Sequence, residues 1–192
     1  MNRSLAAAVL LAACQPPAPK DAQAPATPPG PAAGSPEWKI QNATSAGPRS
    51  ISAAATVMDW PATPDGKMTE LRPGTNGWTC MPDVPSTPGN DPMCLDATFL
   101  QWANAWQSRG RVQIKQAGFG YMLQGGSDAS NTDPFATKAD STSGWINTGP
   151  HVMLVTPNLA SLAPLPVDPQ NGGPWVMWQK TPYAHVMMPV QD

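Results

Sequence analysis

The segments HVMLV (151–155), PWVMWQ (174–179) and AHVMMPV (184–190) decide the fold of the C-terminal half of the chain. Each is short, rich in Val and Met, and flanked by residues that favour turns. Such segments are typical of β-strands with a buried face. Pro189 has no backbone N–H to donate, so the last segment is predicted as an edge strand or as the terminal strand.

A helix is predicted to begin at Pro36. Ser35, Pro36 and Glu37 are the residue types favoured at the N-cap, the first position and the first turn of a helix. The helix is expected to run to about Thr44, before the glycine and proline at 47–48.

Strands are predicted next. The segment RSISAAATVMDW (49–60) reads as a strand in which alternate residues from Ile51 to Val57, including Ala53 and Ala55, share one face. The segments MTELR (68–72) and WTCM (78–81) flank turn residues and predict a β-hairpin.

A second helix is expected after Asp91 or Asp96, either of which is a suitable N-cap. Its amphipathic run ends before Arg109-Gly110 and contains Phe99, Leu100, Trp102, Ala103 and Trp106. GFGYMLQGG (118–126) predicts a strand whose glycines allow a bulge or a close backbone contact, and SDASNTDPF (127–135) predicts a loop. Together these elements predict an α+β fold with a mainly antiparallel sheet and about two short helices.

Two cysteines in the domain predict a disulfide. Cys80 and Cys94 flank a segment rich in proline and glycine, and two such cysteines are expected to pair in a chain that enters an oxidising compartment. Closing a loop of this length stabilises the fold by about 3 kcal/mol. The alternative is a metal-binding or redox pair, although redox motifs usually hold their cysteines much closer together.

The N-terminus reads as an export signal. Arg3 precedes a short apolar run at 5–13, which is far below the ~20 residues that a transmembrane helix needs. The run ends in LAAC (11–14), which resembles the bacterial lipobox. That resemblance implies that residues 1–13 are removed and that Cys14 carries the lipid. The alternative is an ordinary signal peptide followed by an incidental cysteine.

Residues 14–35 are expected to form a lipidated tether. They are rich in Pro and Ala, so they favour extended chain over a packed structure. Gln15 stands where lipoproteins retained in the inner membrane usually carry Asp. The lipobox resemblance therefore implies an outer-membrane anchor, with the domain facing the periplasm or the exterior.

Residues 36–192 have the length of one globular domain. The formal net charge of the whole chain is −2, and removal of Arg3 makes the mature chain one unit more negative. With no basic patch, nucleic acid is excluded as an expected partner. Charged residues make up only 12% of the chain, whereas eight tryptophans are an unusually large number.

Both histidines of the chain occur in a His-x-Met pattern. On a strand, residues two apart share a face, so His151 pairs with Met153 and His185 with Met187. Imidazole and thioether ligands suit Cu(I). The pattern is similar to the His-x-Met ligand pairs of periplasmic copper chaperones, which implies a copper site if the two strands are neighbours. The alternatives are core methionines with structural histidines, or a catalytic histidine, for which no nucleophile signature is present.

Oxygen-bearing side chains are crowded between Asp128 and Asp133. They could hold Ca²⁺, but the full EF-hand pattern is absent and Asx turns explain the same residue types. Trp102 and Trp106 lie four residues apart on the second predicted helix, where they form either core or a platform for a ligand. Trp175 and Trp178 are the other candidate ligand aromatics.

These patterns favour a non-enzymatic envelope lipoprotein that binds a small ligand or another envelope protein, with no cofactor expected. The alternative function is a periplasmic copper-handling protein that binds Cu(I) through the paired His-x-Met motifs. An envelope hydrolase is the third and weakest hypothesis, because no catalytic signature frames the histidines.

Overall fold

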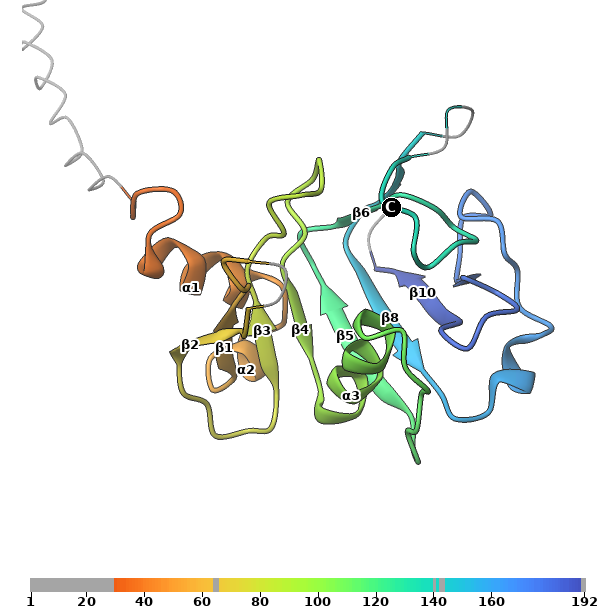
Figure 1. The fold of residues 1–192 in the computed structure, drawn as a ribbon, viewed down its shortest axis with the longest axis horizontal. Coiled ribbons are helices and arrows are strands. Elements are labelled where there is room, and N and C mark those ends of the chain that lie inside the picture. The colour runs from red at the N-terminus through yellow and green to blue at the C-terminus, as the bar shows by residue number, and fades with distance from the viewer. Residues whose placement is uncertain (1–29, 64–65, 140, 142–143, 191–192) are drawn as a thin grey trace, which may run out of the picture.

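The computed structural model describes residues 30–63, 66–139, 141 and 144–190. The predicted signal sequence, Cys14 and most of the predicted tether lie outside the described residues. The fold is α+β, as the sequence predicts (Figure 1). One sheet has eight strands in the order β2-β1-β3-β4-β5-β8-β10-β9, and a second sheet pairs β6 with β7. All strand pairs are antiparallel except β1 with β3.

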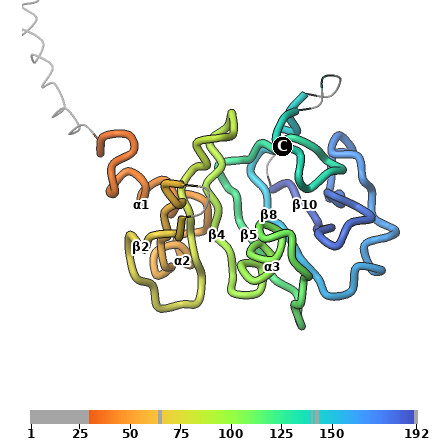
Figure 2. The backbone as a smooth tube through the Cα atoms, in the orientation of Figure 1, coloured from red at the N-terminus to blue at the C-terminus, as the bar shows by residue number. Residues whose placement is uncertain are grey.

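The strands are short. Their bounds are β1 Thr56–Asp59, β2 Thr69–Arg72, β3 Thr79–Met81, β4 Met93–Leu95, β5 Gly118–Met122, β6 Gly126–Asp128, β7 Ile146–Thr148, β8 His151–Val155, β9 Trp175–Met177 and β10 His185–Pro189. The helices are α1 Pro36–Ser45, α2 Arg49–Ser52 and α3 Ala97–Gln107, with the short 3₁₀ helix η1 at Leu159–Leu162. The tube in Figure 2 shows how the chain returns after η1 to place β10 beside β8.

Helices α1 and α3 cover opposite faces of the large sheet. Cys80 and Cys94 pack in one hydrophobic cluster with Ala43 of α1. Their neighbours Met81 and Leu95 pack in another cluster, with residues of α3. Because successive side chains of a strand point to opposite faces, the two helices enclose the sheet from both sides.

Both predicted helices form, and the structure identifies the caps. The Ser35 hydroxyl accepts a hydrogen bond from the Trp38 backbone N–H. Asp96, rather than Asp91, caps α3, and its Oδ1 accepts from the Phe99 N–H at 2.7 Å. The other oxygen of Asp96 accepts from the Phe119 N–H of β5 at 2.7 Å. One carboxylate therefore both starts α3 and attaches it to the sheet.

The predicted strand at 49–60 is wrong over its first half. Pro48 precedes the helical turn α2, and the chain becomes extended only at Thr56. The Arg72 guanidinium donates to the Ser52 and Ala55 carbonyls and so fixes the end of this turn. The alanine run also favours helix over strand, so the alternation of small residues at 51–57 was a misleading signal.

The predicted hairpin of residues 68–72 with 78–81 is also wrong. Strand β1 lies between β2 and β3, pairing antiparallel with the first and parallel with the second. A Cβ on Gly74 would lie 2.0 Å from the Thr56 N atom. The connecting loop therefore passes too close to the start of β1 for any side chain at this position.

Strand β10 is the terminal strand but not an edge strand. It pairs with β8 on one side and with β9 on the other. Pro189 pairs only with His151 of β8, because the pairing with β9 ends at Met187. The proline is tolerated because it lies beyond the doubly paired part of the strand.

The two edges of the large sheet are protected differently. At the β9 edge, the Val176 N–H donates to the Pro166 carbonyl at 2.8 Å. The loop before β9 therefore occupies part of that edge. At the opposite edge, β2 has only four residues, TELR, and two of them are charged.

The Cys80–Cys94 disulfide is present, as predicted. The two cysteines are directly opposite each other on β3 and β4. They close the base of the loop at 82–92, which rises from the two strand ends. In contrast, residues 127 and 128 of the predicted loop SDASNTDPF belong to strand β6.

The predicted close backbone contact at the β5 glycines is confirmed. A Cβ on Gly118 would lie 2.6 Å from the Phe99 N atom and 2.9 Å from the Thr98 Cβ. One on Gly120 would lie 2.8 Å from a methyl carbon of Leu95 on β4 and 3.4 Å from a ring carbon of Phe99 on α3. The absence of side chains at these two positions lets α3 pack directly on β5.

Replacing Gly118 with Ala is expected to destabilise the fold by about 1–3 kcal/mol, because the added methyl group meets the backbone of α3. Urea unfolding followed by tryptophan fluorescence measures this change. Gly149→Ala is the control, since a Cβ there meets no atom within 4 Å. Equal stability of the two variants would contradict close packing of α3 on β5.

Candidate ligand-binding site

Methionines cover the sheet face beneath α3. Met81, Met122, Met153 and Met187 are buried on β3, β5, β8 and β10, and half-buried Met93 lies on β4. Met153 and Met187 are direct cross-strand partners. Alternation within each strand directs these thioethers to the same side.

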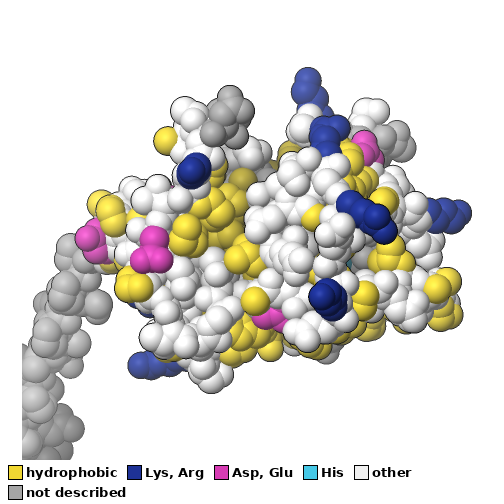
Figure 3. Space-filling model, turned by 60° about the horizontal axis from the view of Figure 1, so that its bottom comes forward, with side chains coloured by type: hydrophobic (Ala, Val, Ile, Leu, Met, Phe, Trp, Pro, Cys, Tyr) yellow, Lys and Arg dark blue, Asp and Glu magenta, His cyan; other side chains and the backbone are white. Residues whose placement is uncertain are grey.

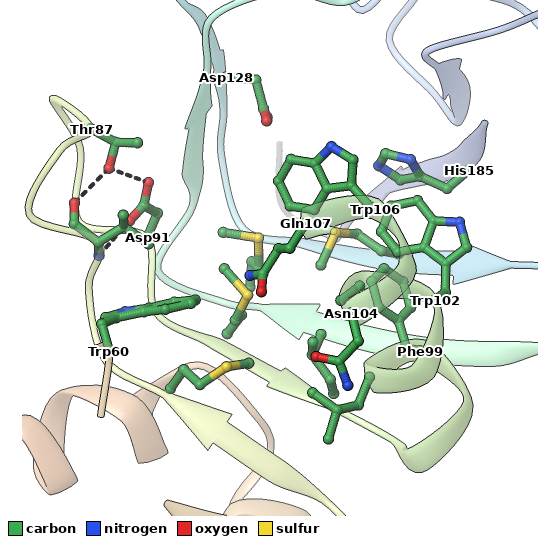
Figure 4. A pocket seen from close by; sticks show the side chains of 18 of the residues that line it. Trp60, Thr87, Asp91, Phe99, Trp102, Asn104, Trp106, Gln107, Asp128 and His185 are labelled. Atoms are coloured by element: carbon green, nitrogen blue, oxygen red, sulfur yellow. Dashed lines mark hydrogen bonds between the residues drawn. The ribbon is translucent and has the colours of Figure 1, made fainter. Parts of the chain in front are cut away.

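A pocket of about 300 Å³ lies over this methionine face (Figure 4). Helix α3 forms one wall, and Trp60 with the loop at 82–92 forms the wall opposite. Its aromatic lining consists of Trp60, Phe99, Trp102, Trp106 and Trp178, and its methionines are Met68, Met81, Met93, Met122, Met153 and Met187. Asp91, Asp128 and His185 supply its titratable groups.

Three of the four predicted ligand aromatics line the pocket. Trp102, Trp106 and Trp178 form one cluster, with ring centroids 5.0–6.2 Å apart. Trp175 is buried elsewhere in the core, and its indole N–H donates to Asn131. Trp60, which the sequence did not single out, lines the opposite wall.

Three of the four indoles that line the pocket have hydrogen-bonded N–H groups. Trp60 donates to the Pro82 carbonyl at 2.7 Å, and Trp106 donates to the Pro134 carbonyl at 2.8 Å. Trp178 donates to the Ser130 carbonyl at 2.9 Å. These rings therefore present only apolar edges and π faces to a ligand.

The backbone of Trp178 is strained. Its φ of 55° lies in the left-handed region, which a bulky residue rarely adopts. The Trp178 backbone N–H donates to the Asn131 carbonyl at 2.8 Å, while its indole bonds the neighbouring Ser130. Strain of this kind is often found at functional sites. Here it directs an indole into the cluster beside the pocket.

Asp91 organises the loop at 82–92. Its carboxylate accepts from the Val84 N–H at 3.0 Å and from the Thr87 hydroxyl at 2.6 Å (Figure 4). The Asp91 N–H donates to Asp83 at 2.9 Å. Burial raises the pKa of Asp91, although the bonds from Thr87 and Val84 oppose this rise.

Asp128 enters the pocket from β6, on a different side from Asp91 (Figure 4). Burial raises the pKa of its carboxyl to about 7, and the negative charge of Asp91 adds to the rise. Near neutral pH the Asp128 carboxyl therefore exists in both protonation states.

His185 is packed between indole rings. Its ring centroid lies 5.0 Å from that of Trp102 and 4.9 Å from that of Trp178, both edge to face. Nδ1 lies 3.1 Å from the Tyr183 carbonyl oxygen. Because a carbonyl only accepts, Nδ1 carries the proton and Nε2 keeps its lone pair in the neutral ring. Burial lowers the pKa of His185 to about 4.

His151 lies on the same face but outside the pocket lining. Its Nδ1 is 2.7 Å from the Gly149 carbonyl oxygen, so Nε2 is again left as an acceptor. That Nε2 is buried and has no hydrogen-bond partner among the described residues. Burial lowers the pKa of this imidazole as well.

The register separates the two histidines. His151 pairs with Pro189, and Met153 pairs with Met187. Continuing this register places His185 beside Val155, four residues along β8 from His151. At about 3.3 Å per residue, the two histidine backbones are about 13 Å apart along the strands. The four predicted copper ligands therefore do not converge as one facing set. Met153, Met187 and His185 line the pocket, whereas His151 instead faces Met122 across β5 and β8.

In the described part of the chain, no group of three or more His, Cys, Asp or Glu side chains is placed to hold a metal ion. Two side-chain oxygens of the loop after β6 serve turns, those of Ser130 and Asp133. Ser130 accepts from the N–H groups of Thr132 and Asp133, and Asp133 accepts from the Phe135 N–H. This geometry matches the Asx-turn interpretation of the sequence.

The surface of the domain is sparsely charged. In the space-filling view, hydrophobic side chains gather near the middle of one face, and the Lys and Arg side chains are scattered around them (Figure 3). Within the described segments, no helix has the length and apolar character needed to cross a membrane. No protein family model, curated protein or solved structure matches the chain.

Sequence reasoning singled out Met153 and Met187 but not the other pocket methionines, and it did not place Asp91 and Asp128 in one pocket. The available signal was the ten methionines of the chain, several at alternating positions of short strands. Their common face depends on the strand order, which joins segments as distant as β3 and β10. That order is not encoded in any local pattern.

The His185 imidazole is expected to titrate near pH 4, because protonation places a charge among buried indoles. NMR detection of the ring protons over pH 3–8 measures the pKa. The urea-unfolded protein is the control and should titrate near 6.5. A native value near 6.5 would show that the ring is solvated rather than enclosed by Trp102 and Trp178.

Proposed function

We propose that this chain is an exported, lipid-anchored envelope protein whose domain binds a small, largely apolar ligand beneath α3. The observation that carries the proposal is the pocket of about 300 Å³ lined by indoles and thioethers. Ligand sites are typically concave and apolar, with a few polar groups that orient the ligand. Asp91, Asp128 and His185 are those groups here.

The chemistry of the lining supports binding of an apolar body. Methionine side chains are flexible and polarisable, so they adapt to the shape of a bound molecule. The indoles on both walls are fixed by bonds to the carbonyls of Pro82, Pro134 and Ser130. A ligand thus meets rigid aromatic walls above an adaptable floor.

A binding role, rather than catalysis, fits the histidines. The Nδ1 atoms of His151 and His185 are bonded to backbone carbonyls, and burial holds both rings neutral at physiological pH. Ser127, the hydroxyl residue next to Asp128, bonds the Asn147 side chain at 3.0 Å rather than an imidazole. These contacts favour a structural role for both histidines over a role as a general acid or base.

The envelope location is proposed from the N-terminal signal and supported by the disulfide. A Cys80–Cys94 bond is stable in an oxidising compartment and is rare in the cytosol. Cys14, at the end of the lipobox-like LAAC, is the proposed lipidation site, followed by the tether to residue 35. Two or more acyl chains suffice for stable anchoring.

The purified domain is expected to bind the neutral dye N-phenyl-naphthylamine, whose fluorescence rises in apolar surroundings. Ala103→Phe places a ring into the pocket from α3 and should weaken dye binding by about tenfold or more. Ala105→Phe, on the same helix but outside the pocket lining, is the control. Undiminished dye binding to a folded Ala103→Phe variant would contradict the proposed site.

Copper handling is the second candidate function. The observation favouring it is that both buried imidazoles keep an Nε2 lone pair and adjoin methionines, His185 with Met187 and His151 with Met122. Nitrogen and thioether donors are preferred by Cu(I). Because the strand register holds His151 and His185 apart, we propose two separate copper sites, each with one histidine and one methionine.

Cu(I) titrated into the apo-protein against a chromophoric chelator tests this candidate. Met187→Leu is expected to weaken Cu(I) binding by about tenfold or more, because it removes one soft ligand. Met188→Leu is the control, since Met188 packs on the opposite face of β10. Identical competition curves for the two variants and the unaltered protein would exclude Met187 as a copper ligand.

A further inference from the structure

The charge of the pocket is one-sided. Among the described residues that line it, Asp91 and Asp128 carry carboxyl groups, and none is Lys or Arg. Asp91 comes from the loop at 82–92 and Asp128 from β6, so the two groups face the cavity from different elements (Figure 4). An apolar cavity with uncompensated negative charge attracts a positively charged ligand.

The two carboxyl groups interact with each other. The negative charge of Asp91 adds to the effect of burial in raising the pKa of Asp128. Asp91 is fixed in place because its oxygens accept bonds from Val84 and Thr87. A cation between the two would favour the ionised form of both and would relieve their repulsion.

The aromatic walls provide a second, independent means of holding a cation. The N–H groups of Trp60 and Trp106 are bonded to backbone carbonyls, so their π faces are the groups left for a ligand. A cation over an indole face is attracted by the negative electrostatic potential of the ring. This contact tolerates a quaternary ammonium group, which has no N–H to donate.

His185 adds a polar group to the same cavity. The side chain is 3% exposed and lines the pocket, and its Nε2 is left as an acceptor. A neutral imidazole beside the methionine floor adds no positive charge that would repel a cation. The titratable groups described in the pocket are therefore two carboxyls and a neutral imidazole, and none of them carries a positive charge.

We propose that the pocket selects a small organic cation, whose charged group lies near Asp128 and the indole faces while its apolar part lies on the methionines. This inference rests on the proposed ligand-binding function and names the chemical class of the ligand. It assigns Asp128 as the residue that discriminates charged from uncharged ligands of the same shape.

A matched pair of probes tests the inference. Meta-hydroxyphenyltrimethylammonium and meta-tert-butylphenol have nearly the same shape, and only the first is charged. Each is titrated against the neutral dye bound to the full-length mature protein at pH 8. The cation is expected to displace the dye at about tenfold lower concentration than its uncharged isostere.

Asp128→Asn keeps the shape of the side chain and removes its charge. This variant is expected to lose most of the preference for the cation while binding meta-tert-butylphenol as before. Asp133→Asn, an exposed carboxylate outside the pocket lining, is the control and should keep the full preference. Melting temperatures of both variants verify that they are folded.

Each outcome is decisive. If meta-tert-butylphenol binds as tightly as the cation or more tightly, the proposed cation preference is wrong, but the proposed apolar ligand site is not contradicted. A preference that persists in Asp128→Asn would overturn the assignment of that residue. Failure of the dye and both probes to bind would overturn the proposed function, and the inference with it.

Discussion

Two hydrogen bonds accepted by the Asp96 carboxylate, one by each oxygen, organise this fold. One oxygen caps α3 at Phe99 and the other binds the Phe119 N–H of β5, which joins the helix to the centre of the sheet. Gly118 and Gly120 leave the room for that close approach. The position of α3 in turn determines where Trp102 and Trp106 lie in the pocket wall.

The opposite wall depends on a separate set of constraints. The Cys80–Cys94 bond ties the two strand ends from which the loop at 82–92 rises, and Asp91 fixes the loop internally. Trp60 joins this wall through its bond to the Pro82 carbonyl. The pocket thus lies between two units held by different interactions, a helix capped on the sheet and a covalently closed loop.

Local signals in the sequence were sufficient for helices α1 and α3, the disulfide and the C-terminal strands. Ser35 and Asp96 carry recognisable capping chemistry, and the segments at 151–155 and 184–190 have strand composition. Strand order was not predictable, because β1 inserts between β2 and β3 through long-range pairing. The separation of His151 from His185 follows from register, which likewise has no local signal.

The protected edges of the large sheet bear on self-association. The Val176 N–H of β9 already donates a hydrogen bond to the Pro166 carbonyl, and the short β2 carries charged side chains at the other edge. Exposed strand edges are the usual templates for intermolecular pairing and fibre growth. With both borders obstructed, neighbouring copies of the domain can be crowded together while their sheets remain separate.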